Sequence, residues 1–167
     1  HAPRRRRVEE LGIRIVNQFD SGEFRNMQMH PKDTGGSFFE IDEQLGEGAH
    51  DADGPWEPAG PAWQEGRRLD RVSGIAAAEI QADDPEKVAA RWSEIAEIPL
   101  SRTEDGYPAL TLDNATVRFV PCTDGRPEGL GGIDVLAADA PAIMAAAREQ
   151  GLATGDRQVR SEEHTSE

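Results

Sequence analysis

The residues best placed to do chemistry in this sequence are carboxylates inside strand-like runs. Glu40 is one of them, and it follows a turn in the segment 30–42, which has the sequence HPKDTGGSFFEID. Alternation along the strand after the turn puts Glu40 on the face opposite Phe39 and Ile41. A carboxylate among apolar neighbours is costly unless it is paired, protonated or bound to a metal. Glu40 is therefore a candidate metal ligand, and the alternative is a strand residue that faces solvent.

The turn before Glu40 predicts how this carboxylate is positioned. Pro31 cannot donate to a central ladder, so we expect the preceding strand to stop there. Gly35 and Gly36 supply the positive φ angles that a tight connection needs. His30 lies at the turn end of the first strand. It can face a substrate cleft and bind substrate, or it can be a histidine of a surface turn.

A second pair of carboxylates lies in an internal repeat. The segments 74–86 and 130–142 each contain a strand, an acidic helix cap, a proline and the start of an amphipathic helix. Glu79 and Asp134 fall at matching positions in the two strands. If their shared face is concave, the two carboxylates converge, and such a pair can perform acid–base catalysis or bind a cationic ligand. The alternative is that one or both face solvent.

The turn and strand around Glu40 resemble the closing hairpin of the vicinal oxygen chelate (VOC) superfamily. This superfamily includes the glyoxalase, bleomycin-resistance, extradiol-dioxygenase and methylmalonyl-CoA-epimerase-like proteins. The HPKDTGG turn is most similar to the epimerase branch, in which the Glu at the position of Glu40 is a metal ligand. The repeat is similar to the βαβββ unit from which VOC domains are built. The resemblance implies an α+β fold of glyoxalase/VOC-type βαβββ modules.

The resemblance also implies a divalent metal (Fe, Mn, Co, Ni or Zn) in the intact first domain, with histidine partners upstream of residue 1. In the second domain, Ala77 and Gly132 occupy the positions where family members place a strand histidine, so we expect no metal there. We expect metal-dependent isomerase, lyase or dioxygenase chemistry on a small organic acid or related metabolite. The alternative is a non-catalytic small-molecule-binding protein of the resistance type.

The patterns predict a tandem-domain protein that is cut at both ends. Residues 1–42 are expected to be the C-terminal part of a first VOC domain, and residues 43–68 a linker rich in Gly, Pro and acids. Residues 69–159 are expected to form a second VOC domain that lacks its closing hairpin. The tail 160–167 resembles a translated sequencing adapter, and we exclude it from the fold.

Hydrophobic periodicity and turn signals predict the individual elements. Helices are expected over 4–11, about 85–95 and 139–150, and strands over 13–19, 24–30, 37–42, 72–82, 109–112, 116–121 and 130–138.

Two hypotheses concern how the two segments meet. Trp56 and Trp63 in the linker indicate that it packs on a surface, and packing against a neighbouring domain is favoured over a binding role. The strands of the first segment could also complete the second domain, so that the strands 37–42 and 130–138 belong to one sheet. The expected outcome is instead partial order or oligomerisation.

Composition excludes several functions. The net charge of −14 and the pI of about 4.7 argue against binding to nucleic acid or to anionic membranes. No apolar stretch is long enough to span a bilayer. The single cysteine, Cys122, cannot form an internal disulfide, so a cytoplasmic location is expected. The expected partner is a small molecule, and a homodimer is possible.

Overall fold

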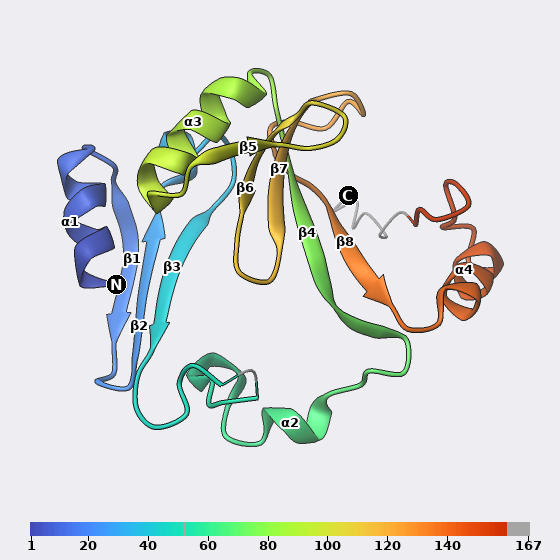
Figure 1. Ribbon diagram of the computed structural model, residues 1–167, viewed down its shortest axis with the longest axis horizontal. Helices are drawn as coiled ribbons and strands as arrows, with labels where there is room; N and C mark the ends of the chain where they lie inside the picture. Colours follow the sequence, from blue (N-terminus) through green and yellow to red (C-terminus); the bar gives the residue numbers. More distant parts are fainter. Residues whose placement is uncertain (52, 160–167) are drawn as a thin grey trace, which may run out of the picture. The chain divides into compact units, whose positions relative to one another are not determined.

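The computed structural model describes residues 1–51 and 53–159 (Figure 1). It contains helices and two β-sheets, so the predicted α+β class is confirmed. The predicted tail 160–167 lies outside the described residues. No helix of the described residues is long and apolar enough to cross a membrane. Internal contacts divide the chain into two units, which are described separately: His1–Gly66 with Ala76–Asp134, and Arg67–Ile75 with the residues from Val135 on.

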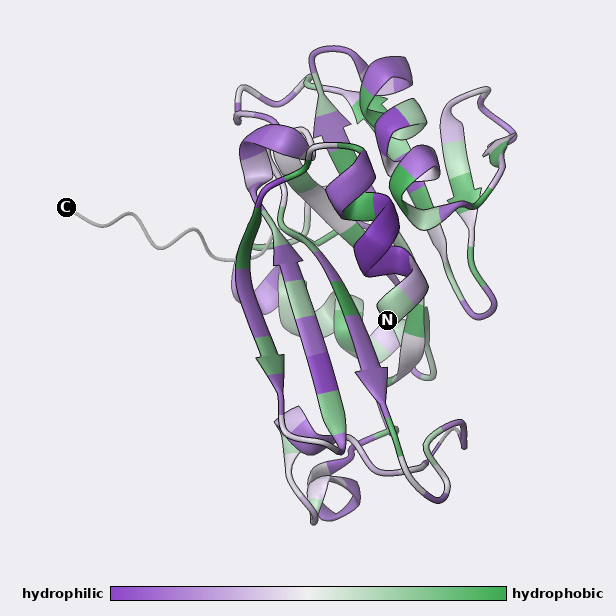
Figure 2. Cartoon of the chain, turned by 90° about the vertical axis from the view of Figure 1, so that its left-hand side faces the viewer, coloured by the Kyte–Doolittle hydropathy of each residue, from purple (hydrophilic) through white to green (hydrophobic). Residues whose placement is uncertain are grey.

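A helix and three antiparallel strands form the first part of unit one. The elements are α1 (Ala2–Glu10), β1 (Ile15–Asp20), β2 (Phe24–Met29) and β3 (Phe39–Gln44), and the strand order is β1-β2-β3. Hydrophilic and hydrophobic residues alternate along these strands (Figure 2). The apolar face packs beneath α1 in a core of Val8, Ile13, Met27, Met29 and Ile95, with Phe39 and Ile41 against it.

The connection between β2 and β3 is built on two glycines, as the sequence predicts. A short 3-10 helix, η1 (Pro31–Asp33), is followed by Gly35 at φ 78° and Gly36 at φ 88°. Both glycines are also closely packed. A Cβ on Gly36 would lie 2.8 Å from the backbone oxygen of Glu128, and one on Gly35 would lie 2.7 Å from the side chain of Val88. Any other residue would therefore be strained and would clash at either position.

The linker contains η2 (Glu57–Ala59) and the short helix α2 (Trp63–Gly66). Trp56 packs edge-on against Phe24 of β2, with ring centroids 5.2 Å apart and an interplanar angle of 85°. The prediction that the linker packs on a surface is confirmed at this contact. The surface is the end of the three-stranded sheet.

The second sheet has the strand order β5-β6-β7-β4-β8. Strand β4 runs parallel to β7, whereas β6 pairs antiparallel with both β5 and β7. The chain order from β4 to β7 is strand, helix and three strands. The elements are β4 (Val72–Ala82), α3 (Pro85–Ala96), β5 (Leu100–Arg102), β6 (Pro108–Thr111), β7 (Thr116–Pro121), β8 (Gly129–Ala137) and α4 (Ala140–Glu149).

The predicted helix caps are present in both halves of the repeat. The side chain of Asp84 accepts a hydrogen bond from the backbone N–H of Lys87 at 3.1 Å, and Pro85 opens α3. Asp139 accepts from the N–H of Ala142 at 3.0 Å. Each cap satisfies one backbone donor that the first helical turn leaves without a partner. The two helices therefore begin where the sequence repeat placed them.

Helix α3 joins the two sheets of unit one through Trp92. The Trp92 ring stacks on Phe39 at 4.3 Å and meets Phe119 of β7 edge-on at 5.5 Å. Its Nε1 donates to the backbone oxygen of Thr34 at 2.7 Å. The two sheets share a core but not a ladder, because β3 and β8 lie in different sheets. The hypothesis that these strands belong to one sheet is therefore wrong.

Candidate functional site

Glu40 lies on the outer face of the three-stranded sheet, opposite the core. Phe39 and Ile41 point into the core, as the alternation predicted. Glu40 is exposed, and amide groups of β2 donate to both of its oxygens. Asn26 Nδ2 donates to Oε1, and Gln28 Nε2 donates to Oε2 at 2.9 Å. Glu40 is therefore hydrogen-bonded to neutral groups, and its negative charge is not balanced by them.

Asp42 adds a second carboxylate to this face. Asn26 Nδ2 also donates to Asp42 Oδ1 at 2.7 Å, and the Asn26 side chain is almost fully buried, with 6% exposed. Partial burial raises the pKa of Asp42, and the charge of Glu40 raises it further. Two like charges held by one amide repel each other, so a cation between them would be favourable. We call Asn26, Gln28, Glu40 and Asp42 the carboxylate–amide face.

The side chains of this face offer oxygen donors to a divalent metal. Carboxylate and amide oxygens suit hard cations, and Glu40 and Asp42 each have a carboxylate to offer. The described residues contain no group of three His, Cys, Asp or Glu side chains that could hold a metal ion. The face thus supplies part of a ligand set. The metal role of Glu40 therefore stays a prediction.

His30, the predicted substrate-binding residue, has a structural contact in the turn. It caps η1, because its Nδ1 accepts a hydrogen bond from the backbone N–H of Lys32 at 3.1 Å. The same turn is fixed by Arg14, which donates through Nε and NH2 to the two oxygens of Asp33 at 2.9 and 2.7 Å. These hydrogen bonds hold the pKa of Asp33 well below its usual range. His30 Nε2 remains the group that could contact a ligand.

The structure brings Glu79 and Asp134 together on one arginine. Arg118 of β7 donates from Nε to Glu79 Oε2 at 2.8 Å. It also forms a two-point ion pair with Asp134, in which NH2 donates to Oδ1 at 3.0 Å and NH1 donates to Oδ2. Arg118 is opposite Glu79 in the parallel ladder of β4 and β7. We call these three residues the arginine triad.

The electrostatics of the arginine triad differ from those of the carboxylate–amide face. Hydrogen bonds from Arg118 lower the pKa of Asp134 despite its partial burial. The same contacts raise the pKa of Arg118, the largest contribution being the hydrogen bonds with Asp134. Asp134 and Arg118 are therefore both charged at neutral pH. An ionised carboxylate in a two-point pair with arginine is better suited to holding structure or charge than to donating a proton.

Sequence reasoning placed the two carboxylates and missed the arginine between them. The signal was available in strand 116–121, where Val117 and Phe119 are core residues and Arg118 alternates with them. Arg118 must then share a face with one side of the neighbouring strand. The sequence alone did not show that β7 lies directly beside β4, and this pairing is what brings Arg118 to Glu79.

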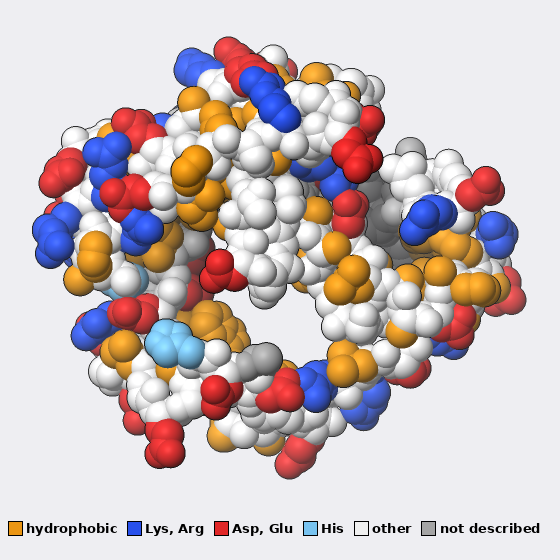
Figure 3. Space-filling view, viewed as in Figure 1, with side chains coloured by type: hydrophobic (Ala, Val, Ile, Leu, Met, Phe, Trp, Pro, Cys, Tyr) orange, Lys and Arg blue, Asp and Glu red, His pale blue; other side chains and the backbone are white. Residues whose placement is uncertain are grey.

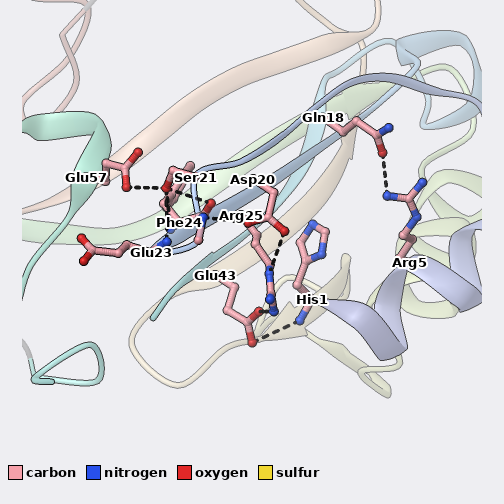
Figure 4. Close-up of polar contacts among 11 residues, drawn as sticks. His1, Arg5, Gln18, Asp20, Ser21, Glu23, Phe24, Arg25, Glu43 and Glu57 are labelled. Carbon is pink, nitrogen blue, oxygen red and sulfur yellow. Dashed lines mark hydrogen bonds and ion pairs between the residues drawn. The ribbon is translucent and has the colours of Figure 1, made fainter. Parts of the chain in front are cut away.

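On the opposite face of the three-stranded sheet, the carboxylates are paired with an arginine. Arg25 lies between Asp20 and Glu43, with nitrogen–oxygen distances of 3.2 Å to each (Figure 4). The hydrogen bond with Glu43 makes the largest contribution to a raised pKa of Arg25. The same strands therefore have paired charge on one face and unpaired carboxylate charge on the carboxylate–amide face.

Comparison with known proteins gives a limited result. No protein-family model and no curated protein matches the chain. Among solved structures, it is similar to the crystal structure of a hypothetical protein from Staphylococcus aureus, with a TM-score of 0.47 and 12% sequence identity. The match covers 83% of this chain and 54% of that chain, so the chain spans about half the length of the matched protein.

Proposed function

We propose that this chain is part of a VOC-type protein that acts on a small organic acid or related metabolite at the carboxylate–amide face. The observation that carries the proposal is the placement of Glu40. It stands exposed on the last strand of the first sheet, beside a second carboxylate and two amides. The strand–helix–three-strand order of residues 72–121 also supports it, because this is the unit from which VOC domains are built.

Each residue of this face has a distinct task in the proposal. Glu40 contributes an oxygen ligand to a divalent metal, which would polarise substrate oxygens and stabilise an anion formed from the substrate. Asp42 keeps the local potential negative. Asn26 and Gln28 fix the orientation of Glu40 through its two oxygens, as neighbouring hydrogen bonds commonly do for metal-ligating carboxylates. Isomerase, lyase and dioxygenase reactions are all compatible with this arrangement.

A second candidate function is ligand binding without chemistry, in the manner of resistance proteins. The arginine triad favours it for the second region, because Glu79 and Asp134 are both engaged by Arg118. Carboxylates held by an arginine can accept a hydrogen bond from a polar ligand more readily than they can transfer protons. In both candidates the partner is a small molecule. A cytoplasmic location, indicated by the single cysteine, and a homodimer belong to the same proposal.

The test is metal binding by the full-length protein and by its Glu40→Gln variant. Calorimetric titration with Mn²⁺, Co²⁺ and Zn²⁺ measures affinity, and circular dichroism checks the fold. We expect Glu40→Gln to weaken metal binding at least about tenfold while the thermal transition stays in place. The matched control is Glu43→Gln, which removes a charge from the same strand on the opposite face. Equal affinities of the full-length protein, Glu40→Gln and Glu43→Gln would contradict a role for Glu40 in metal binding.

A further inference from the structure

The linker and the end of the three-stranded sheet form an open cavity, lined by residues other than those of the carboxylate–amide face. Its volume is about 570 Å³, within the range of small-molecule sites. The lining side chains include two tryptophans, Trp56 and Trp63. The remaining lining residues are glycines, prolines, glutamines and four acids: Glu23, Asp51, Asp53 and Glu57. Among the described residues, the lining contains no Lys, Arg or His.

Packing alone does not account for Trp56. Trp56 contacts Phe24 edge-on, which is the packing role that the sequence predicted. Even so, 39% of Trp56 stays exposed, and the residue lines the cavity. An exposed indole beside carboxylates is the arrangement in which proteins bind organic cations, because the ring face is electron-rich and the acids supply negative charge.

The walls of the cavity are held in place before any ligand binds. Glu57 Oε2 accepts a hydrogen bond from the Ser21 hydroxyl at 2.7 Å (Figure 4). The backbone N–H of Glu57 donates to Gln44 Oε1 at 2.9 Å. Trp63 Nε1 donates to the backbone oxygen of Gly54 at 3.1 Å. A wall already fixed by such contacts loses little conformational freedom on binding, which favours affinity for a small ligand.

We propose that this cavity binds a small organic cation of the methylated-ammonium type. Tryptophan and carboxylate together match a diffuse positive charge on an apolar surface. A bare metal ion is a poorer match, because the described residues contain no group of three His, Cys, Asp or Glu side chains placed to hold one. Acidic side chains are visible along the linker at the bottom of Figure 3. They give the approach to the cavity the sign of charge that attracts a cation.

The experiment compares choline with its neutral carbon isostere, 3,3-dimethylbutan-1-ol, by isothermal titration calorimetry on the whole chain. The two probes have nearly the same shape, so a difference in affinity reports the positive charge. We expect saturable choline binding with a Kd of about a millimolar and at least about fivefold weaker binding of the alcohol. Equal affinities for the two probes, or no saturable choline binding, would overturn the proposal.

Variants then assign the binding to this cavity. We expect Glu57→Gln and Trp56→Leu each to weaken choline binding about three- to fivefold. Glu57→Gln keeps the shape of the side chain, so it remains informative if Trp56→Leu destabilises the contact with Phe24. The matched control is Glu47→Gln, which removes one charge from the same linker outside the cavity lining. A loss in Glu47→Gln as large as in Glu57→Gln would show a general charge effect and would contradict the site.

Discussion

The carboxylate–amide face and the arginine triad surround a pair of strand carboxylates with different kinds of partner. Each holds two strand carboxylates on a sheet face opposite an apolar core. On the first sheet, the partners of Glu40 and Asp42 are the neutral amides of Asn26 and Gln28. On the second sheet, one arginine pairs with both carboxylates. The first face therefore keeps its negative charge, whereas Arg118 offsets half of the carboxylate charge on the second.

The difference shows which residues decide the role of a strand carboxylate. Burial is similar in kind at the two places, and the sequence patterns around Glu40 and Glu79 are equally strand-like. What differs is the residue opposite on the neighbouring strand: Gln28 stands opposite Glu40, and Arg118 stands opposite Glu79. A cross-strand neighbour thus sets whether a carboxylate is available to a ligand or is committed to the fold.

The comparison depends on both sheets belonging to one folded unit, and Trp92 is the residue that joins them. We expect Trp92→Ala to lower the free energy of unfolding by about 3–5 kcal/mol, the range for truncating a large buried aromatic. The loss includes the stacking on Phe39 and the hydrogen bond to Thr34. Urea unfolding followed by circular dichroism and by near-ultraviolet absorbance measures it.

Trp92→Phe is the matched control, because it keeps a ring against Phe39 and removes the hydrogen bond to the Thr34 oxygen. We expect it to cost about 1–2 kcal/mol. In the unmutated chain both probes should report one transition, since the two sheets share this core. Two separate transitions would show that the sheets fold independently, and the comparison would then describe two domains and not two faces of one unit.

The second prediction concerns the ion pairs of the arginine triad. We expect Arg118→Met to destabilise the protein by about 1–2 kcal/mol at pH 7. Arg118 and Glu79 are 25% and 28% exposed and Asp134 is 51% exposed. The cost should therefore fall between those of a surface pair and a buried pair. The matched control is Arg102→Met, which breaks an exposed pair with Glu86 and should destabilise the protein less than Arg118→Met does.

The destabilisation caused by Arg118→Met should change with pH in a defined direction. Arg118 lowers the pKa of Asp134 in the folded state. Its contribution is fully present above the pKa of an unfolded aspartate, about 3.9, and is lost as the pH falls through the lowered folded value. The destabilisation caused by Arg118→Met should therefore be full at pH 7 and smaller at about pH 2, below the pKa of an unfolded aspartate. A difference that grows on acidification would contradict the charge-pair account.

The sequence predicted most of the fold because the local signals were strong. The caps Asp84 and Asp139 begin both repeat helices as expected, and strand β7 has the predicted bounds. Strand β5 was missed, since three residues are too few to show a period. The arrangement of the two sheets was also not predictable, because it depends on Trp92 meeting residues more than fifty positions away.

The sequence predicted the candidate site only where the alternation of residues along a strand determines which face a side chain lies on. Period-two patterning placed Glu40 away from the core and gave Glu79 a definite face. It could not identify Asn26, Gln28 or Arg118 as their partners, because strand pairing and register are properties of the folded chain. His30 shows a related limit: its position at the turn was predicted, but its ring accepts a hydrogen bond from the backbone of its own turn.

The third prediction concerns the carboxylate–amide face, and its expected effect on stability is the smallest of the three. Burial, with a further contribution from Glu40, raises the pKa of Asp42 in the folded state. A carboxyl with a raised pKa opposes folding at pH values above that pKa, and the penalty disappears below the unfolded value. We therefore expect Asp42→Asn to stabilise the protein at pH 7 by about 0.3 kcal/mol, a value discounted for solvent screening. The gain should fade toward pH 3, the opposite sign to Arg118→Met. Urea midpoints at the two pH values measure it, and a loss of stability at pH 7 would show that the hydrogen bond from Asn26 outweighs the repulsion from Glu40.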